Sequence, residues 1–220
     1  MLRASLMTLV SWLFAIALAH AQGFKFSNDD ESAKADRARE AERQSRVQAQ
    51  LATPCRNKIK NQKIMVLIGE DRNGVISAKQ TAYSSHVDAI NQRLKSLGLR
   101  TYSPEEIRRQ VAQAEIDAYF KNDPDAALSA SKRLAAQYIL RGLIATQTGR
   151  NPYVNVNQVS IRMNFTLTGA NGRMISQADA RNESYAGHDT AGMALTLINE
   201  RADEVVAQLY SDYCQKSGVR

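Results

Sequence analysis

The sequence has few of the residues from which enzymes usually build metal sites and nucleophilic sites. It holds two cysteines and three histidines among 220 residues. Zinc sites need several Cys and His residues at short spacing, and no such set occurs. A glycine-rich phosphate loop and the local motifs of Ser or Cys nucleophiles are also missing. The sequence therefore predicts no cofactor, no metal site and no enzymatic activity.

Aromatic residues are scarce as well, at 6% of the chain, although the net charge is +7 and the pI is about 9.5. An excess of positive charge makes nucleic acid a partner to consider. Single-stranded nucleic acid is bound by stacking on aromatic side chains, and here the basic residues are scattered. We expect a basic, solvated surface and no nucleic-acid partner.

One long apolar run occurs, and it lies at the amino terminus. Arg3 precedes a largely apolar stretch from 6 to 18, and Ala19-His20-Ala21 has the form of a cleavage site. This pattern predicts a signal peptide over 1–21, cleaved on export to the periplasm; the alternative is an uncleaved anchor. No later segment is apolar enough for a spanning helix, so we expect no stable membrane insertion.

The two cysteines, Cys55 and Cys214, both follow this leader. Export to an oxidising compartment makes a disulfide between them the first interpretation. Two buried thiols are the alternative. A metal site is the least favoured interpretation of the two cysteines, because His86 and His188 are the only histidines after the leader.

Composition divides the remaining chain into three parts. Residues 22–54 are rich in Ala, Glu and Arg and lack a wide apolar stripe, which indicates a charged flexible or loosely helical arm. Residues 55–214 form the expected α/β domain, and 215–220 are a tail. The domain begins with a buried strand, "KIMVLIG" over 63–69. A helix ending at Gly98 follows, with an apolar face of Tyr83, Val87, Ile90, Leu94 and Leu97.

The middle of the domain is expected to be helical between two strands. "LRTY" is a short strand, and Ser103-Pro104 with Glu106 forms a capping box that starts a helix. The expected core face of this helix is Ile107, Val111, Ala114 and Ala118. Asp123-Pro124 begins another helix that runs to Leu134, and "QYILRGLIAT" is the next strand.

The stretch "QVSIRMNFTLTGANGRMISQADA" alternates between apolar and polar residues. Asn171-Gly172 predicts a two-residue hairpin loop, which places Phe165 opposite Ala178. Small residues opposite large ones favour a soluble sheet covered by a helix over a lipid-facing barrel strand. Val154 and Val156 are out of phase with this alternation, so we expect a β-bulge near 157–158.

A long final helix carries Leu195, Ile198, Ala202, Val205 and Leu209 on one face. The predicted order is β-α-β-α-α-β-β-β-α. We therefore expect a single α/β domain in which helices pack on a mixed sheet with an antiparallel hairpin.

This pattern resembles a family of bacterial envelope domains. Its members include the activator of a penicillin-binding protein, the soluble part of the curli secretion channel, the amino-terminal domain of the Tol propeller protein and a flagellar T-ring domain. The similar segments are "KIMVLIGEDRNG", "LKSLGL", "LAAQYILRGLIAT" and "MNFTLTGANGRMISQADA", within about 63–207. The resemblance implies a soluble, non-catalytic domain that binds other cell-envelope proteins.

Three classes of function compete: an interaction module, a binder of an envelope polymer or small ligand, and an enzyme. A polymer binder would use "TGRNPYVNVNQ", with Arg150 and Tyr153. An enzyme would need convergent titratable residues, and Glu70-Asp71 is explained more simply as part of a turn. We favour an accessory or assembly factor that works by binding other envelope proteins.

The polar face of the hairpin is the candidate binding site. In the predicted register Arg162 lies opposite Arg181, and such a like-charge pair destabilises a sheet unless it is solvated or neutralised by a partner. A solvated surface is the plain alternative. The candidate site residues are Arg150, Arg162, Arg173, Asp179 and Arg181.

Overall fold

The computed structural model describes residues 27–153 and 155–216. The chain divides into two units, and the boundary between them lies between residues 39 and 40. The expected signal peptide over 1–21 lies outside the described residues, as do the last four residues of the expected tail. Among the helices described, none is both long enough and apolar enough to cross a bilayer.

Helix α1 (Ser27–Leu51) begins in the first unit and ends in the second. It occupies most of the stretch for which the sequence favoured a flexible or loosely helical arm. Ion pairs one turn apart, Arg43–Glu40 and Arg46–Glu42, support its helical conformation. Within the second unit Val47 is buried and the Gln50 amide donates to the side chain of Gln208 on the final helix.

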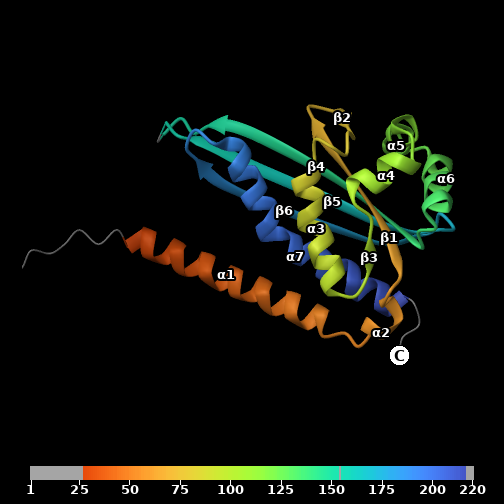
Figure 1. The fold of residues 1–220 in the computed structure, drawn as a ribbon. Coiled ribbons are helices and arrows are strands. Elements are labelled where there is room, and N and C mark those ends of the chain that lie inside the picture. Colours follow the sequence, from red (N-terminus) through yellow and green to blue (C-terminus); the bar gives the residue numbers. More distant parts are fainter. Residues whose placement is uncertain (1–26, 154, 217–220) are drawn as a thin grey trace, which may run out of the picture. The chain divides into compact units, whose positions relative to one another are not determined.

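The second unit is built on a six-stranded mixed sheet, which confirms the predicted α/β class (Figure 1). The strand order is β2-β1-β4-β5-β6, and β3 pairs with the first residues of β1. β1 runs parallel to β3 and β4, whereas β4, β5 and β6 are antiparallel to one another in turn. The strands are β1 (Lys63–Arg72), β2 (Val75–Ser77), β3 (Arg100–Thr101), β4 (Tyr138–Arg150), β5 (Asn157–Gly169) and β6 (Met174–Ala186).

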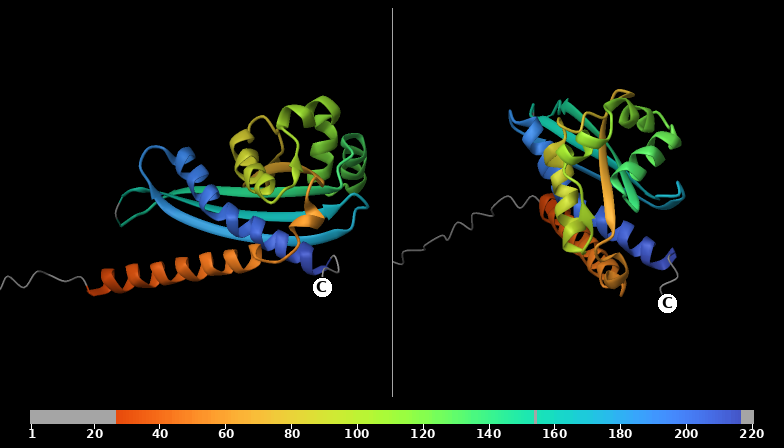
Figure 2. Two further views of the ribbon diagram at one scale, coloured as in Figure 1. Left: turned by 60° about the horizontal axis from the view of Figure 1, so that its bottom comes forward. Right: turned by 45° about the vertical axis from the view of Figure 1, so that its right-hand side comes forward.

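Helices cover the two faces of the sheet unequally. α3 and α7 pack on one face, and α4, α5 and α6 lie over β1 and the start of β4 on the other. Figure 2 shows the far parts of β4, β5 and β6 extending beyond these three short helices. The helices are α2 (Arg56–Ile59), α3 (Ser84–Ser96), α4 (Pro104–Gln110), α5 (Gln113–Phe120), α6 (Pro124–Leu134) and α7 (Thr190–Lys216).

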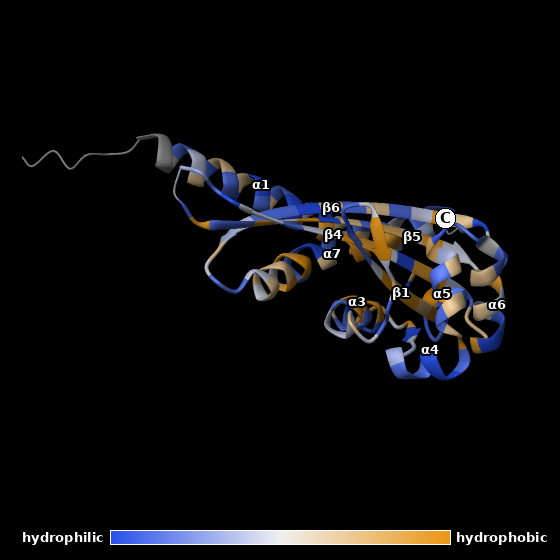
Figure 3. Ribbon diagram, turned by 90° about the horizontal axis from the view of Figure 1, so that it is seen from above, coloured by the Kyte–Doolittle hydropathy of each residue, from blue (hydrophilic) through white to orange (hydrophobic). Residues whose placement is uncertain are grey.

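The larger core lies between the sheet and the pair α3 and α7. Hydrophobic residues gather on β1, β4 and β5 and on these two helices, whereas much of β6 is hydrophilic (Figure 3). The predicted pairing of Phe165 with Ala178 is confirmed, and both side chains are buried. Ala178 and Ala180 leave room on β6 for the side chains of α7, as expected from the small residues of this strand.

The connection between β5 and β6 differs from the predicted two-residue loop. It comprises residues 170–173, and Gly172 alone in it has a positive φ, 78°. A type I′ turn would need positive φ at Asn171 as well. The register is nevertheless as predicted, because an irregularity between Leu167 and Thr168 compensates for the longer connection.

The β-bulge expected near 157–158 is wrong. β5 begins at Asn157 and pairs without interruption from there to Leu167. Val156 precedes the strand and is 39% exposed, so it does not need to share the alternation of β5. Val154, the other residue that led to this expectation, lies outside the described residues.

Two further elements differ from the sequence-based expectation. The helix that starts at the predicted Ser103 capping box ends at Gln110. Val111 has an extended backbone with a φ of −121°, and α5 then starts a new helix. Ala114 is consequently exposed, and Ile116 and Phe120 fill the core instead. The strand expected over 63–69 continues to residue 72 and forms a hairpin with β2, which was not predicted.

The predicted disulfide between Cys55 and Cys214 is confirmed. It joins the residue before α2 to the last turn of α7, across 159 residues of sequence. Both cysteines are buried. Tyr210 reinforces this junction, because its hydroxyl donates to the Thr53 carbonyl and accepts from the Cys55 amide.

We expect the disulfide to contribute about 5 kcal/mol to the free energy of unfolding, since closing a loop of this length restricts the unfolded chain. The double variant Cys55→Ser/Cys214→Ser should therefore unfold at a much lower urea concentration than the oxidised protein. Reductant should lower the midpoint of the wild type and leave that of the variant unchanged. Equal midpoints for oxidised wild type and variant would contradict the expectation.

A second prediction concerns the packing of Phe165 over β4. A Cβ atom at Gly142 would lie 2.6 Å from Ile68 Cδ1 and 2.8 Å from Phe165 Cζ. Gly142→Ala should therefore reduce the free energy of unfolding by about 1–3 kcal/mol. Gly149→Ala on the same strand is the control, because nothing lies within 4 Å of its added Cβ. A similar urea midpoint for both variants would contradict close packing at Gly142.

Candidate functional site

The half of the sheet that α4, α5 and α6 leave uncovered presents polar side chains to solvent. Alternation places every second residue of β5 and β6 on this side, which we call the open face. None of these side chains is fully buried, in contrast to the apolar residues that point toward α7. The open face comprises Ser160, Arg162, Asn164, Thr166, Gln177, Asp179, Arg181 and Glu183.

Arg162 and Arg181 lie directly opposite each other at the middle of the open face. Both are exposed, and neither forms an ion pair with a carboxylate in the part of the chain that the structure describes. Asp179 is next to Arg181 on the same face, yet its carboxylate accepts a 2.5 Å hydrogen bond from the Asn164 amide. The side chains of the open face thus include two arginines and two carboxylates, Asp179 and Glu183, and the two arginines lie directly opposite each other.

A third arginine approaches this pair from α7. Arg201 lines a surface hollow of about 470 Å³ together with both members of the pair and one carboxylate, Glu183. The Arg201 guanidinium is held by the Asn182 side-chain oxygen, which accepts from Nη2 at 3.3 Å, and by Glu204 at 3.5 Å. Glu204 offsets the charge of Arg201, so the two guanidinium groups of the arginine pair are left with one carboxylate, Glu183, in the hollow, and this excess favours an anionic group over a cation.

Arg201 was not anticipated from the sequence. The spacing of residues on α7 shows its apolar stripe but does not show which strand its flanks contact. The packing of α7 against β6 is a property of the folded chain. A hint was present in the sequence, because Arg201 directly precedes Ala202 on the apolar stripe and so lies at its border.

Two of the predicted site residues lie away from the arginine pair. Arg150 pairs with Asn157 at the far end of β4, and alternation places it on the opposite face from Arg162. Arg173 belongs to the connection before β6. Met174, the first residue of β6, is seven strand steps, roughly 23 Å, away from Arg181. The structure thus brings together Arg162, Arg181 and Asp179.

The end of β1 carries a second group of titratable residues. Glu70 forms an ion pair with Arg72 at 2.9 Å and accepts a hydrogen bond from the Tyr83 hydroxyl at 3.2 Å. Asp71 accepts from the Gly74 amide, which agrees with the expected role of Glu70-Asp71 in a turn. Both carboxylates are thus engaged in local contacts at the end of β1.

His86 lies at the edge of this group. Its ring meets the Tyr83 ring edge-on, with 5.9 Å between the centroids, and Nδ1 is buried without a hydrogen-bond partner. Burial lowers the pKa of His86, and the charge of Glu70 opposes that shift in part. His86 is therefore a boundary residue, as expected from the sequence. Within residues 27–153 and 155–216, no three His, Cys, Asp or Glu side chains form a group that could hold a metal ion.

The lowered pKa of His86 leads to a pH-dependent stability. The folded state favours the neutral ring, so its contribution is present above the unfolded pKa of about 6.5 and decreases as the pH falls below it. We expect the difference in urea midpoint between wild type and His86→Phe to shift in favour of the variant from pH 7.5 to 5.5. A difference that stays constant over this range would contradict burial of the neutral ring.

Solved structures resemble this chain only at low sequence identity. No protein-family model matches it, and no curated protein matches it. Among solved structures, the PelC dodecamer from Paraburkholderia phytofirmans aligns with 68% of this chain and 88% of its own, at 15% identity and a TM-score of 0.40.

Two other solved structures align over similar lengths. The LpoB C-terminal domain from Salmonella enterica shares 16% identity, covering 59% of this chain and 93% of its own, with a TM-score of 0.36. Lipoprotein GNA1162 from Neisseria meningitidis shares 13% identity, covering 62% and 92%, with a TM-score of 0.38. Similarity at this level establishes neither a family nor a function.

Proposed function

We propose that this chain is a non-catalytic interaction module of the bacterial cell envelope. In this proposal the open face binds an acidic surface of another envelope protein. The observation that carries the proposal is the pair Arg162 and Arg181, which lie side by side without an ion pair to a carboxylate of the described chain.

The chemistry of the arginine pair favours a carboxylate-bearing partner. Guanidinium groups bind carboxylates through two parallel hydrogen bonds, a geometry that lysine does not offer. Two arginines on neighbouring strands repel each other in the free protein, and an anionic group placed between them would remove that repulsion. Arg201 lines the same hollow, and Glu204 lies 3.5 Å from its guanidinium. Binding energy would therefore come from charges that are already in position.

The form of the open face favours a protein partner over a small substrate. β5 and β6 are each 13 residues long, so the face offers an extended surface rather than an enclosed pocket. Asn, Thr and Gln side chains flank the arginines and supply neutral hydrogen-bonding groups, which form the polar parts of protein interfaces. Arginine is also enriched among the residues that dominate binding energy at such interfaces.

The proposed compartment rests on two features. The first 21 residues have the pattern of an export signal. Cys55 and Cys214 form a disulfide, and disulfides form and persist mainly in oxidising compartments. Both features support an envelope location in which the partner would also reside.

Reversal of both arginines tests the proposal. The variant Arg162→Glu/Arg181→Glu should fold with a urea midpoint close to that of the wild type, because both side chains are exposed. Adducts to partner proteins in mildly cross-linked cells should fall about tenfold or more, because like charges would then face each other across the interface. Quantitative mass spectrometry of the recovered adducts measures this loss.

The control carries the same change in net charge elsewhere. Arg150→Glu/Lys95→Glu alters one exposed residue on the opposite face of the sheet and one on α3, and should retain the wild-type adducts. Retention by both variants would exclude the open face as the docking surface. Loss in both would mean that net charge, rather than the arginine pair, determines binding.

A further inference from the structure

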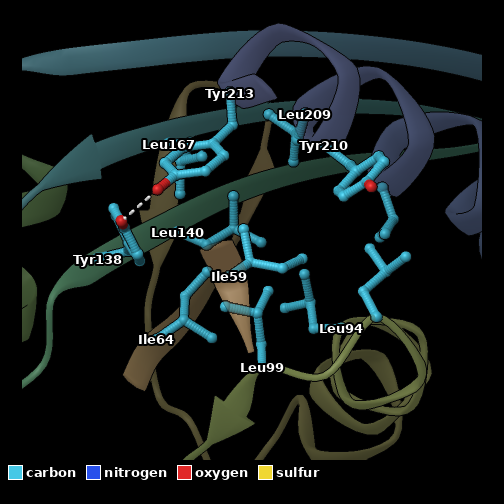
Figure 4. Close-up of a pocket in the computed structure, with 12 residues that line it drawn as sticks. Ile59, Ile64, Leu94, Leu99, Tyr138, Leu140, Leu167, Leu209, Tyr210 and Tyr213 are labelled. Atoms are coloured by element: carbon cyan, nitrogen blue, oxygen red, sulfur yellow. Dashed lines mark hydrogen bonds between the residues drawn. The ribbon is translucent and has the colours of Figure 1, made fainter. Parts of the chain in front are cut away.

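The interior of the larger core leaves little room for a ligand. The apolar cavity between α2, α3, β1 and the end of α7 measures about 30 Å³, and the hydroxyls of Tyr138 and Tyr213 form a 2.8 Å hydrogen bond beside it (Figure 4). Such a volume takes about one small group, such as a methylene. Larger hollows of the described chain lie at its surface.

One of these surface hollows is lined mainly by neutral polar residues, and we call it the polar hollow. It measures about 620 Å³, and the turn between β1 and β2 forms one of its sides. It adjoins the hollow of the arginine pair through Ser160 and Glu183, but neither arginine of the pair lines it. The lining residues are Arg72, Asn73, Thr146, Gln147, Thr148, Gly149, Gln158, Ser160 and Glu183.

Three amide side chains of the polar hollow are available to a ligand. Asn73 lies in the turn after β1, Gln147 on β4 and Gln158 on β5. None of these three side chains forms a hydrogen bond with another residue of the described chain. Each amide offers two donor hydrogens and an acceptor oxygen. The polar hollow therefore presents several hydrogen-bonding groups that only solvent or a ligand can engage.

The shape of the site is set by a glycine and a tyrosine in one row across the sheet. Gly149 pairs with Gln158, and Gln158 pairs with Tyr185, so the three residues lie side by side on β4, β5 and β6. A Cβ atom added at Gly149 would have nothing within 4 Å, and a glycine inside a strand often marks a close approach of a ligand. Tyr185 is 55% exposed, and the Asn151 amide donates to its hydroxyl at 3.4 Å.

The polar hollow carries little charge. Arg72 forms a 2.9 Å ion pair with Glu70, which offsets its charge. Glu183 is the single carboxylate among the described residues that line the hollow. An anionic ligand would find no unpaired cation among these residues and would be repelled by Glu183. The polar hollow therefore suits an uncharged ligand with many hydrogen-bonding groups.

We propose that the polar hollow binds a neutral sugar chain, such as a segment of an envelope polysaccharide. Neighbouring hydroxyls of a sugar ring hydrogen-bond to the nitrogen and the oxygen of one amide, and Gln147 and Gln158 present both groups without internal partners. The apolar face of the sugar ring packs on the exposed ring of Tyr185. Gly149 allows the sugar to approach the strand closely.

A peptide matches the polar hollow less well than a sugar does. An extended peptide pairs its backbone groups best with an exposed strand edge, whereas the row of Gly149 and Gln158 lies on two paired strands inside the sheet. The segment "TGRNPYVNVNQ", which the sequence suggested for polymer binding, supplies three of the lining residues, although Arg150 and Tyr153 are not among them. Because the arginine pair does not line the polar hollow, this proposal and the binding of an envelope protein are independent.

Titration of the wild-type protein with short sugars provides the first test. The probes are maltotriose, cellotriose and triacetylchitotriose, followed by nuclear magnetic resonance. At least one of them should shift the side-chain amide resonances of Asn73, Gln147 and Gln158 in a saturable way. Trigalacturonate, which is acidic, and tetra-alanine, which is a peptide, should leave these resonances unchanged. The proposal is overturned if no neutral sugar shifts them at millimolar concentration, or if tetra-alanine or trigalacturonate shifts them as strongly.

Variants locate the binding in the polar hollow. Gly149→Trp places a large side chain in the hollow and should abolish the shifts, yet its urea midpoint should stay near that of the wild type because the space around the added Cβ is empty. Gln158→Leu removes one amide and should weaken binding about fivefold. Gln177→Leu, the same change on the open face but outside the polar hollow, is the control and should bind like the wild type. Equal affinity of the two Leu variants, or retained binding by folded Gly149→Trp, would exclude this site.

Discussion

The packing of α7 against β5 and β6 is the contact on which the remaining structure depends. Val159 to Leu167 point every second side chain toward this helix, and the small residues of β6 allow it to approach. Because side chains of a strand alternate, burying one set necessarily presents the other set to solvent. The polar open face and its arginine pair therefore follow from the same hairpin that forms the core.

Sequence signals that act over a few residues predicted their elements well. The Ser103 capping box, the Asp123 cap of α6 and the apolar stripe of α3 all occur in the structure. The errors arose where packing decided the outcome. The extended conformation of Val111 separates α4 from α5, and α5 then packs Ile116 and Phe120 into the smaller core. No residue pattern near Val111 indicates this break in the helix.

The candidate site was predictable only in the part that depends on register. Counting residues outward from the expected two-residue loop placed Arg162 opposite Arg181. The connection is longer than expected, but the irregularity between Leu167 and Thr168 offsets the extra residues, so this pairing is correct. Arg150 could have been separated from the pair by following the alternation of β4 through its pairing with β5. Arg201 lies on α7, which follows the hairpin in sequence, so its position beside the arginine pair requires the packing of α7 on the sheet.

The disulfide makes residues 55–214 a covalent ring. The Cα atoms of Cys55 and Cys214 are 5.7 Å apart, a distance that a linker of very few residues spans. The order in which the elements follow one another from amino to carboxyl end is therefore not essential to this architecture. New termini opened in the connection between β4 and β5 would leave every strand and helix of the ring continuous, so the domain is suited to circular permutation at that point.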